Sequence, residues 1–251
     1  MGWGDEILAL GRAERYHEAT GDPVSIRAKD GKARDNILWH GNPAWSKDAK
    51  ESIIDGPGAR PYLLGFTADS RGDPVAHFNL KHRARAGRIH LTLAERDSVT
   101  IREPFAVISP HVKDNASRNK QWGVDRWQQV IEGFPIPVYQ LGPPTSIIAG
   151  AQHYHTPTMR DAAAVIDRAA VVLTNEGGTH HLAAAMQRPA VVIFGAFIPP
   201  SVTGYDFHAN MAVETDEGYC GRWGECEHCK LAMAQITPAM VKERAMQILG
   251  A

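Results

Sequence analysis

Residues Ala169 to Gly195 read AAVVLTNEGGTHHLAAAMQRPAVVIFG, and this stretch decides the fold. A β-branched apolar run at 171–173 leads into a turn with two glycines, an alanine-rich segment as far as Gln187 and a second apolar run at 191–194. This order predicts strand, turn, helix and strand, which is one βαβ unit. Both strands are apolar on both faces, as expected for a parallel sheet that helices cover on each side.

The turn inside this unit has the features of an anion site. Its paired glycines let the backbone approach a ligand closely, and the helix that follows points unpaired N–H groups and a positive dipole end toward it. Phosphate suits such a turn well. A turn of this kind also occurs without a ligand, with a histidine serving only as a helix cap, so both interpretations stay open. The candidate binding residues of the turn are Glu176, Gly177, Gly178, Thr179, His180 and His181.

Strands and helices alternate regularly from residue 104 onward. The expected strands are 105–109, 138–141, 153–155 and 211–213, and the expected helices are 124–132, 159–168 and 238–249, besides those of the central unit. This alternation predicts an α/β fold with a doubly wound parallel sheet. Ligands bind such sheets at the carboxyl ends of the strands, so the loops after Ser109, Gly142 and Thr174 should open toward one crevice.

The first 103 residues are irregular and rich in loops. A helix is expected from Asp5 until Gly21 ends it, and short strands are expected at 24–28, 36–39, 61–66 and 89–93. Because Asp5 follows a glycine turn, it is either a cap or first-turn acid worth about 1 kcal/mol or a general base.

Cationic residues occur at two places of interest. The loop at 111–122 holds Arg118 and Lys120; Lys120 faces the phosphate turn if the sheet has the expected geometry, and is otherwise an exposed lysine beside a helix. A basic cluster lies at 81–88, either as a solvated face or as a contact for an anionic acceptor.

Composition narrows the class of protein. The chain has 251 residues, 43% of them hydrophobic, with a net charge of −1 and a pI near 6.9, so no global basic field recruits nucleic acid or lipid. No apolar run reaches the roughly 18 residues of a membrane span, and no signal segment follows Met1, so we expect a cytoplasmic protein.

Three cysteines, Cys220, Cys226 and Cys229, cluster near the end of the chain. An odd number argues against a disulfide framework. Their spacing fits a metal-binding loop with His228 or the more distant His208 as fourth ligand, and free reduced thiols are the alternative.

The stretch TNEGGTHHLAAAMQRPAVVIFG resembles the signature of glycosyltransferase family 9, the heptosyltransferase-like enzymes, which read T-N-D-S-G-x-x-H-L-A-A-A before a strand ending in F-G. Other pieces resemble the family in the right order, and the resemblance covers most of 105–249. These pieces are Gly2-x-Gly4-Asp5, Lys120-Gln121-Trp122 with Trp127, Thr158 with 161–164, and Ile236-Thr237-Pro238 with Val241.

The resemblance implies a GT-B-like architecture, with two Rossmann-like domains of which the N-terminal one is reduced. Residues 1–103 would form the acceptor-side domain, and 104–251 would bind a nucleotide-diphosphate sugar, often ADP-heptose in this family. A heptose or hexose would pass to an acceptor hydroxyl with inversion and without metal at the anomeric centre.

The resemblance also assigns roles to residues. Asp5 matches the family's base, and Lys120 matches a lysine on the diphosphate. The residues that match those around phosphate and sugar are Glu176, Gly177, Gly178, Thr179 and His181. A cysteine cluster before the last helix resembles the zinc- or iron-binding fingers of some members. Glu176 replaces the family's aspartate and Gly177 its serine, which leaves the sugar open.

Two other functions remain open beside an ordinary sugar transferase. One is a phage-type DNA-base glycosyltransferase that uses the basic cluster on the phosphate backbone. The other is a non-catalytic module that binds nucleotide sugars. The acceptor of a transferase would be a saccharide, a protein or modified DNA.

Overall fold

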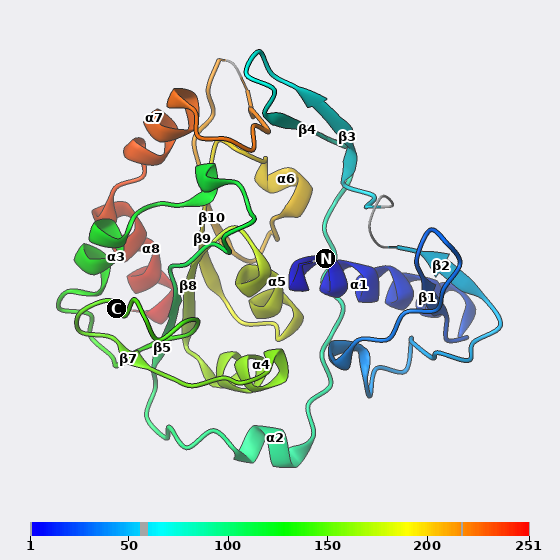
Figure 1. Cartoon of the computed structure of the whole chain (residues 1–251). Coiled ribbons are helices and arrows are strands. Elements are labelled where there is room, and N and C mark those ends of the chain that lie inside the picture. Colours follow the sequence, from blue (N-terminus) through cyan, green and yellow to red (C-terminus); the bar gives the residue numbers. More distant parts are fainter. Residues whose placement is uncertain (1, 56–59, 217, 251) are drawn as a thin grey trace.

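The computed structural model describes residues 2–55, 60–216 and 218–250, and its centre is a parallel sheet of six strands (Figure 1). Its order is β10-β9-β8-β5-β6-β7. The strands are β5 (Ala106–Ser109), β6 (Val138–Gln140), β7 (Gln152–His153), β8 (Val171–Asn175), β9 (Ala190–Gly195) and β10 (Ala209–Ala212). The chain runs outward from β5 to β7 and then returns to β8 on the other side of β5. This reversal makes the gap between β5 and β8 a topological switch point, where sheets of this type bind ligands. The predicted α/β class is confirmed.

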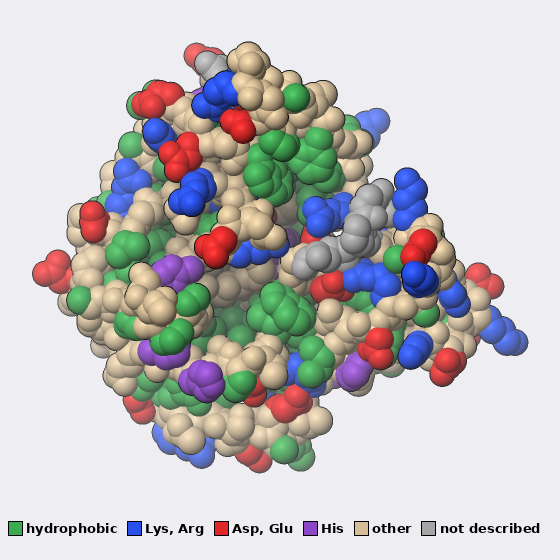
Figure 2. Space-filling view, viewed as in Figure 1, with side chains coloured by type: hydrophobic (Ala, Val, Ile, Leu, Met, Phe, Trp, Pro, Cys, Tyr) green, Lys and Arg blue, Asp and Glu red, His purple; other side chains and the backbone are tan. Residues whose placement is uncertain are grey.

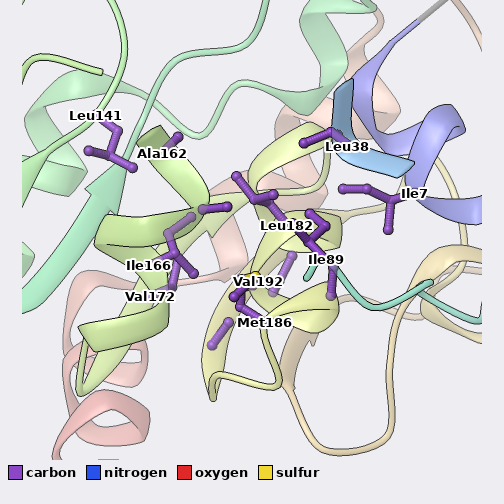
Figure 3. Packing of buried hydrophobic residues seen from close by; sticks show 14 of the residues in the cluster. Ile7, Leu38, Ile89, Leu141, Ala162, Ile166, Val172, Leu182, Met186 and Val192 are labelled. Carbon is purple, nitrogen blue, oxygen red and sulfur yellow. The ribbon is translucent and has the colours of Figure 1, made fainter. Parts of the chain in front are cut away.

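Helices cover both faces of the sheet and form two cores with it. Because side chains alternate along a strand, Val172 of β8 joins the core under α4 (Met159–Arg168) and α5 (Gly178–Ala185). Figure 3 shows Val172 in this core beside the helices. Val171 and Leu173 face the opposite core. That second core lies under α3 (Val124–Ile131), α7 (Glu227–Gln235) and α8 (Pro238–Leu249).

The N-terminal part is reduced, as predicted. Its main element is α1 (Trp3–Thr20), whose apolar residue Ile7 reaches the α5 core beside Leu182 (Figure 3). Among the described residues before 104, the paired strands are short: β1 (Ser25–Arg27) lies parallel to β2 (Ser52–Ile54), and β3 (Leu63–Ala68) forms an antiparallel hairpin with β4 (Pro74–Phe78). Figure 1 shows this hairpin reaching over toward α6 (Pro200–Thr203) and α7.

Some expected elements differ from the structure. The segment Ile37–Trp39 is a 3-10 helix, η1, rather than a strand, because Asn36 caps it by accepting the N–H of Leu38. Residues 89–92 form no strand, and α2 (Leu93–Asp97) follows them. The sequence also gave no expectation of α7 or β4.

The helices of the described residues include none with the length and apolar character needed to cross a membrane.

Candidate functional site

The loops that follow β5 and β8 meet at the switch point of the sheet. The hydroxyl of Ser109, the last residue of β5, lies 3.0 Å from that of Thr179 in the first turn of α5. The side chain of Asn175, at the end of β8, donates to the carbonyl of Pro110 at 2.6 Å. The glycine turn at 176–178 therefore opens at the edge of the sheet where a ligand was expected.

An ion pair joins the two loops at this point. The ammonium of Lys120, in the 3-10 turn η2 (Arg118–Lys120), contacts the carboxylate of Glu176. Their side chains are only 17% and 5% exposed. Burial is the largest single influence and would raise the pKa of Glu176, but the adjacent Lys120 ammonium, His180 and Thr203 together outweigh burial and leave that pKa lowered. Lys120 also lies 5.1 Å from the ring centre of Phe197. Lys120 therefore lies beside the glycine turn, as expected from the sequence.

The N-terminus of α1 meets the N-terminus of α5, which brings Asp5 to the same region. A side chain at Gly4 has no room, because its Cβ would lie 2.3 Å from the ring of His181. On the other side, Gly178 approaches Trp3 and the backbone of Gly4. This close approach places the N-terminal ends of α1 and α5 next to each other, and the first N–H groups of each helix have no partner within that helix.

Asp5 is held by three groups and is 10% exposed. One oxygen accepts the hydroxyl of Tyr62 at 2.6 Å, and the other accepts the N–H of Gly2 at 3.0 Å and lies 3.2 Å from the guanidinium of Arg60. Burial raises the pKa of Tyr62 well above its usual value, and the charges of Asp5 and then Glu176 raise it further. The phenol therefore stays protonated and donates to Asp5.

A small cavity of about 60 Å³ connects these groups. The hairpin β3–β4 and the segment before it line one part of the cavity, and residues of η2, α5, α6 and the loops after β8, β9 and β10 line the rest. The polar residues that line it are Arg60, Tyr62, Lys120, Glu176, His181 and Thr203. Asp5 adjoins this cavity through Arg60 and Tyr62. Figure 2 shows charged side chains of both signs at the centre of this face, where Figure 1 places the start of α1.

The two histidines of the turn are buried and neutral. The N–H of Gly177 donates to Nδ1 of His180 at 2.9 Å, so Nε2 carries the proton and donates to the carbonyl of Thr203 at 2.9 Å. The hydroxyl of Tyr205 lies 2.6 Å from Nδ1 of His181. Burial lowers the pKa of both histidines, that of His181 strongly. His180 thus fixes the shape of the turn, and neither ring supplies positive charge at neutral pH.

Arg118 does not reach this cavity, contrary to the expectation that it binds the donor. It is exposed and lines a separate groove with Gly123 and Arg126. The reason is the 3-10 geometry of η2, in which successive side chains point about 120° apart. Lys120 therefore faces Glu176, while Arg118 points elsewhere.

The three cysteines and one histidine converge. The sulfur of Cys220 lies 3.7 Å from that of Cys226 and 3.0 Å from that of Cys229, and the donor atoms of these three and His228 lie within 4.8 Å of one another. Thiolates on a tetrahedral metal, with bonds of about 2.3 Å, are roughly 3.8 Å apart. The separation of Cys220 and Cys226 matches this value, whereas that of Cys220 and Cys229 is shorter. Three thiols and an imidazole are a donor set that zinc or iron takes. His208 is not part of the cluster, since its Nε2 lies 3.1 Å from the carbonyl of Arg188.

Sequence reasoning missed Arg60 and Tyr62. Tyr62 is 57 positions from Asp5 along the chain, and no local pattern links the two residues. Tyr62 lies in a segment that reads only as a short apolar strand, and Arg60 directly precedes that segment.

Comparisons with known proteins agree with this geometry. A family model described as "Glycosyltransferase family 9 (heptosyltransferase)" matches residues 157–221, which supports the resemblance expected from the sequence. A search of curated proteins found no match.

Three solved structures are similar in fold. The ADP-heptose lps heptosyltransferase II of E. coli is 18% identical, with a TM-score of 0.50 over 66% of this chain and 54% of its own. The iron-containing dodecameric glycosyltransferase TibC of enterotoxigenic E. coli H10407 is 17% identical, with a TM-score of 0.67 over 100% of this chain and 76% of its own. A glycosyl transferase family 9 protein of Veillonella parvula DSM 2008 is 14% identical, with a TM-score of 0.65 over 99% of this chain and 95% of its own.

These likenesses confirm the predicted GT-B-like fold class. The chain spans about half the length of the E. coli heptosyltransferase II that it matches.

Proposed function

We propose that this chain is a glycosyltransferase that moves a heptose or hexose from a nucleotide-diphosphate donor to an acceptor hydroxyl with inversion. The observation that carries the proposal is the convergence at one cavity of Lys120, Glu176 of the glycine turn and Tyr62, whose hydroxyl donates to Asp5. The family match and the ADP-heptose named for the E. coli relative support a donor of this class.

In this proposal the diphosphate of the donor binds at the glycine turn. The first N–H groups of α5 have no partner within the helix and would bind phosphate oxygens, and the dipole of the helix favours negative charge there. Lys120 would exchange part of its contact with Glu176 for a phosphate oxygen. As the sugar leaves, these donors stabilise the charge that develops on the departing diphosphate.

Asp5 is the proposed general base. In an inverting displacement one carboxylate removes the proton of the acceptor hydroxyl while that oxygen attacks the anomeric carbon. Tyr62 and Arg60 hold the Asp5 carboxylate in place, and Glu176, the one carboxylate among the described residues that line the cavity, is occupied by Lys120. Each carboxylate thus has a separate task.

The cysteine cluster has a structural role in this proposal. Cys220, Cys226, Cys229 and His228 would hold zinc or iron, and the similarity in fold to the iron-containing TibC supports iron. No step of the sugar transfer passes through this metal.

A basic groove of about 340 Å³ supports an acceptor that carries negative charge. Arg12 and Arg15 of α1 form one side, and Lys81, Arg83 and Arg85 form the other. Pro61, between the two Asp5 partners Arg60 and Tyr62, also lines the groove, so an acceptor bound there would lie near the proposed base. A saccharide acid, an acidic protein segment and modified DNA share this chemistry.

Release of nucleoside diphosphate tests the proposal. ADP-, UDP- and GDP-linked sugars are incubated with the wild type and with Asp5→Asn, and slow hydrolysis of the donor is followed. We expect release from one donor class, reduced about 10²- to 10⁴-fold in Asp5→Asn while donor affinity persists. Binding without release in the wild type would instead indicate a non-catalytic module.

A further inference from the structure

The loop from Cys220 to Cys226, called here the cysteine loop, contacts each part of the molecule that builds the proposed donor site. Apart from an isolated bridge at Arg222, it contains no helix or strand of its own. Its ends are brought together by the sulfur atoms of Cys220 and Cys226, with Cys229 and His228 just beyond.

The first contact fixes the turn that carries Lys120. The buried side chain of Asn119 donates to the carbonyls of Arg222 and Gly224 at 2.9 and 2.8 Å and accepts the N–H of Cys226 at 3.1 Å. The hydroxyl of Ser117 also donates to the carbonyl of Arg222, at 3.0 Å. All hydrogen bonds of the Asn119 side chain therefore go to the cysteine loop, one residue before the lysine.

The second contact holds the hairpin. The N–H of Ala76 in β4 donates to the carbonyl of Gly221 at 2.8 Å, and that of Trp223 donates to Pro74 at 2.8 Å. Gly221 has a φ of +60°, and its Cβ would lie 2.1 Å from the carbonyl oxygen of Ala76, so only glycine fits. The hairpin in turn continues from Tyr62, the partner of Asp5.

The third contact is with the segment that carries Phe197, the ring partner of Lys120. The N–H groups of Cys220 and Gly221 donate to the carbonyls of Ala196 and Phe197, both at 3.1 Å. The ring of Phe197 is the one over which the Lys120 ammonium lies. The cysteine loop thus supports Lys120 in two ways. It holds the turn that carries the lysine backbone, and it holds Phe197, over whose ring the ammonium lies.

We propose that a metal ion in the cysteine cluster positions the donor site, by holding the cysteine loop so that Asn119 places Lys120 at Glu176 and the hairpin places Tyr62 at Asp5. The consequence for the donor rests on the function proposed above. Asn119 is a positioning residue in this scheme, because it acts on the diphosphate only through Lys120. Without the metal, a loop with little regular structure can adopt far more conformations. Lys120 and Tyr62 would then both be held less firmly, since the same loop positions both.

Hydrogen exchange by mass spectrometry tests the positioning without any donor. We compare the metal-loaded protein with the same protein after removal of the metal by a chelator. Exchange should rise at 117–121 and 74–78, whose groups bond to the cysteine loop, and should stay unchanged in α8 and in α1 after its first turn. Unchanged exchange at the two segments, or an equal rise throughout the chain, overturns the proposal.

Pyrophosphate titration tests the effect on the donor site. Asn119→Ala is compared with Asn42→Ala, since Asn42 is also buried and also makes three side-chain hydrogen bonds, remote from the cysteine loop. We expect Asn119→Ala to keep its metal content and to bind pyrophosphate at least about 10-fold more weakly than wild type, as for loss of one charge-assisted hydrogen bond. Asn42→Ala should bind as the wild type does.

Equal affinities in the two variants would overturn the role of Asn119. Absence of pyrophosphate binding in the wild type would contradict the proposed function instead, and the exchange experiment would still decide the positioning role of the metal.

Discussion

Lys120 and Glu176 form a buried ion pair, and removing one member has a different effect from removing both. Lys120→Met leaves the Glu176 carboxylate buried without its partner, which should destabilise the fold by about 3–5 kcal/mol. The double variant Lys120→Met/Glu176→Gln should regain most of that stability. Binding of ADP should be about 10-fold weaker or worse in both variants, since the charged contact to phosphate is gone from each. Urea unfolding and calorimetric titration measure the two effects separately.

The double variant is the decisive control. If it regained ADP affinity along with stability, the loss in Lys120→Met would reflect unfolding, and Lys120 would have no contact with the diphosphate.

His208 gives a pH dependence of stability with a defined sign. Burial lowers the pKa of His208 to about 3, whereas the unfolded chain takes up this proton near pH 6.5. Below pH 6.5 the unfolded state therefore binds more protons, and stability falls by up to about 1.4 kcal/mol per pH unit until the folded pKa is reached. His180 and His181 act in the same direction, because burial lowers the pKa of each.

The variant His208→Gln should lose less stability on acidification than the wild type. At pH 5 the free energy of unfolding of the wild type should have fallen by about 2 kcal/mol more than that of the variant. Urea unfolding at pH 7, 6 and 5 measures both decreases. Parallel decreases in the two proteins would mean that His208 titrates normally in the folded state.

Sequence patterns located some site residues and not others, for a physical reason. Glu176 stands inside one βαβ unit, where a local motif specifies the turn. Lys120 and Asp5 needed the family resemblance, because their roles depend on which loops the sheet brings together. Tyr62 and Asn119 act through contacts with residues more than 50 positions away, which no local pattern encodes.

At the scale of elements, the packing of α1 on α5 sets the distance between base and donor turn. Gly4→Ala would normally stabilise a helix by about 0.5–1 kcal/mol. Here the new methyl meets His181 at 2.3 Å, so we expect a net loss of about 1–3 kcal/mol and reduced donor hydrolysis. Thermal unfolding and nucleoside diphosphate release measure both.

A matched substitution in the same helix is Ala9→Gly, which opens space in the core and leaves the contact between the two helix starts unchanged. It should lower stability without a specific loss of donor hydrolysis. A Gly4→Ala protein that is more stable than wild type and fully active would show that α1 does not pack tightly on α5.

The elements after residue 104 were predictable because each is long or strongly patterned. Strands β5, β8 and β9 are buried on both faces, and Thr158 and Thr237 cap the helices that follow them. The N-terminal elements lack such signals. Ile37–Trp39 is as apolar as a strand, yet the Asn36 cap and the packing of Trp39 make it a 3-10 turn.

At the scale of the whole molecule, the net charge of −1 gives no indication of the basic groove beside the site. Arg12 pairs with Asp55, and Arg85 with Glu18, whereas Arg15 and Arg83 form no ion pair within the described part of the chain. Reversing both charges, in Arg15→Glu/Arg83→Glu, should weaken an anionic acceptor about 10-fold or more and should leave ADP binding unchanged.

Salt dependence distinguishes the acceptors. Binding of duplex DNA that weakens steeply with salt, and is lost in the double variant, would favour the DNA-base alternative. Arg102→Glu, an exposed change outside the groove, is the control and should bind as the wild type does. Acceptor binding that is the same in all three proteins would remove the groove from the acceptor site.

The most direct measurement of the central claim is a crystal structure of the protein with a bound nucleoside diphosphate. The diphosphate should lie at the glycine turn, with phosphate oxygens about 2.7–3.2 Å from the Lys120 ammonium and from an N–H at the start of α5, across the cavity from Tyr62 and Asp5. A diphosphate bound in the basic groove, with Lys120 still paired only to Glu176, would contradict the account.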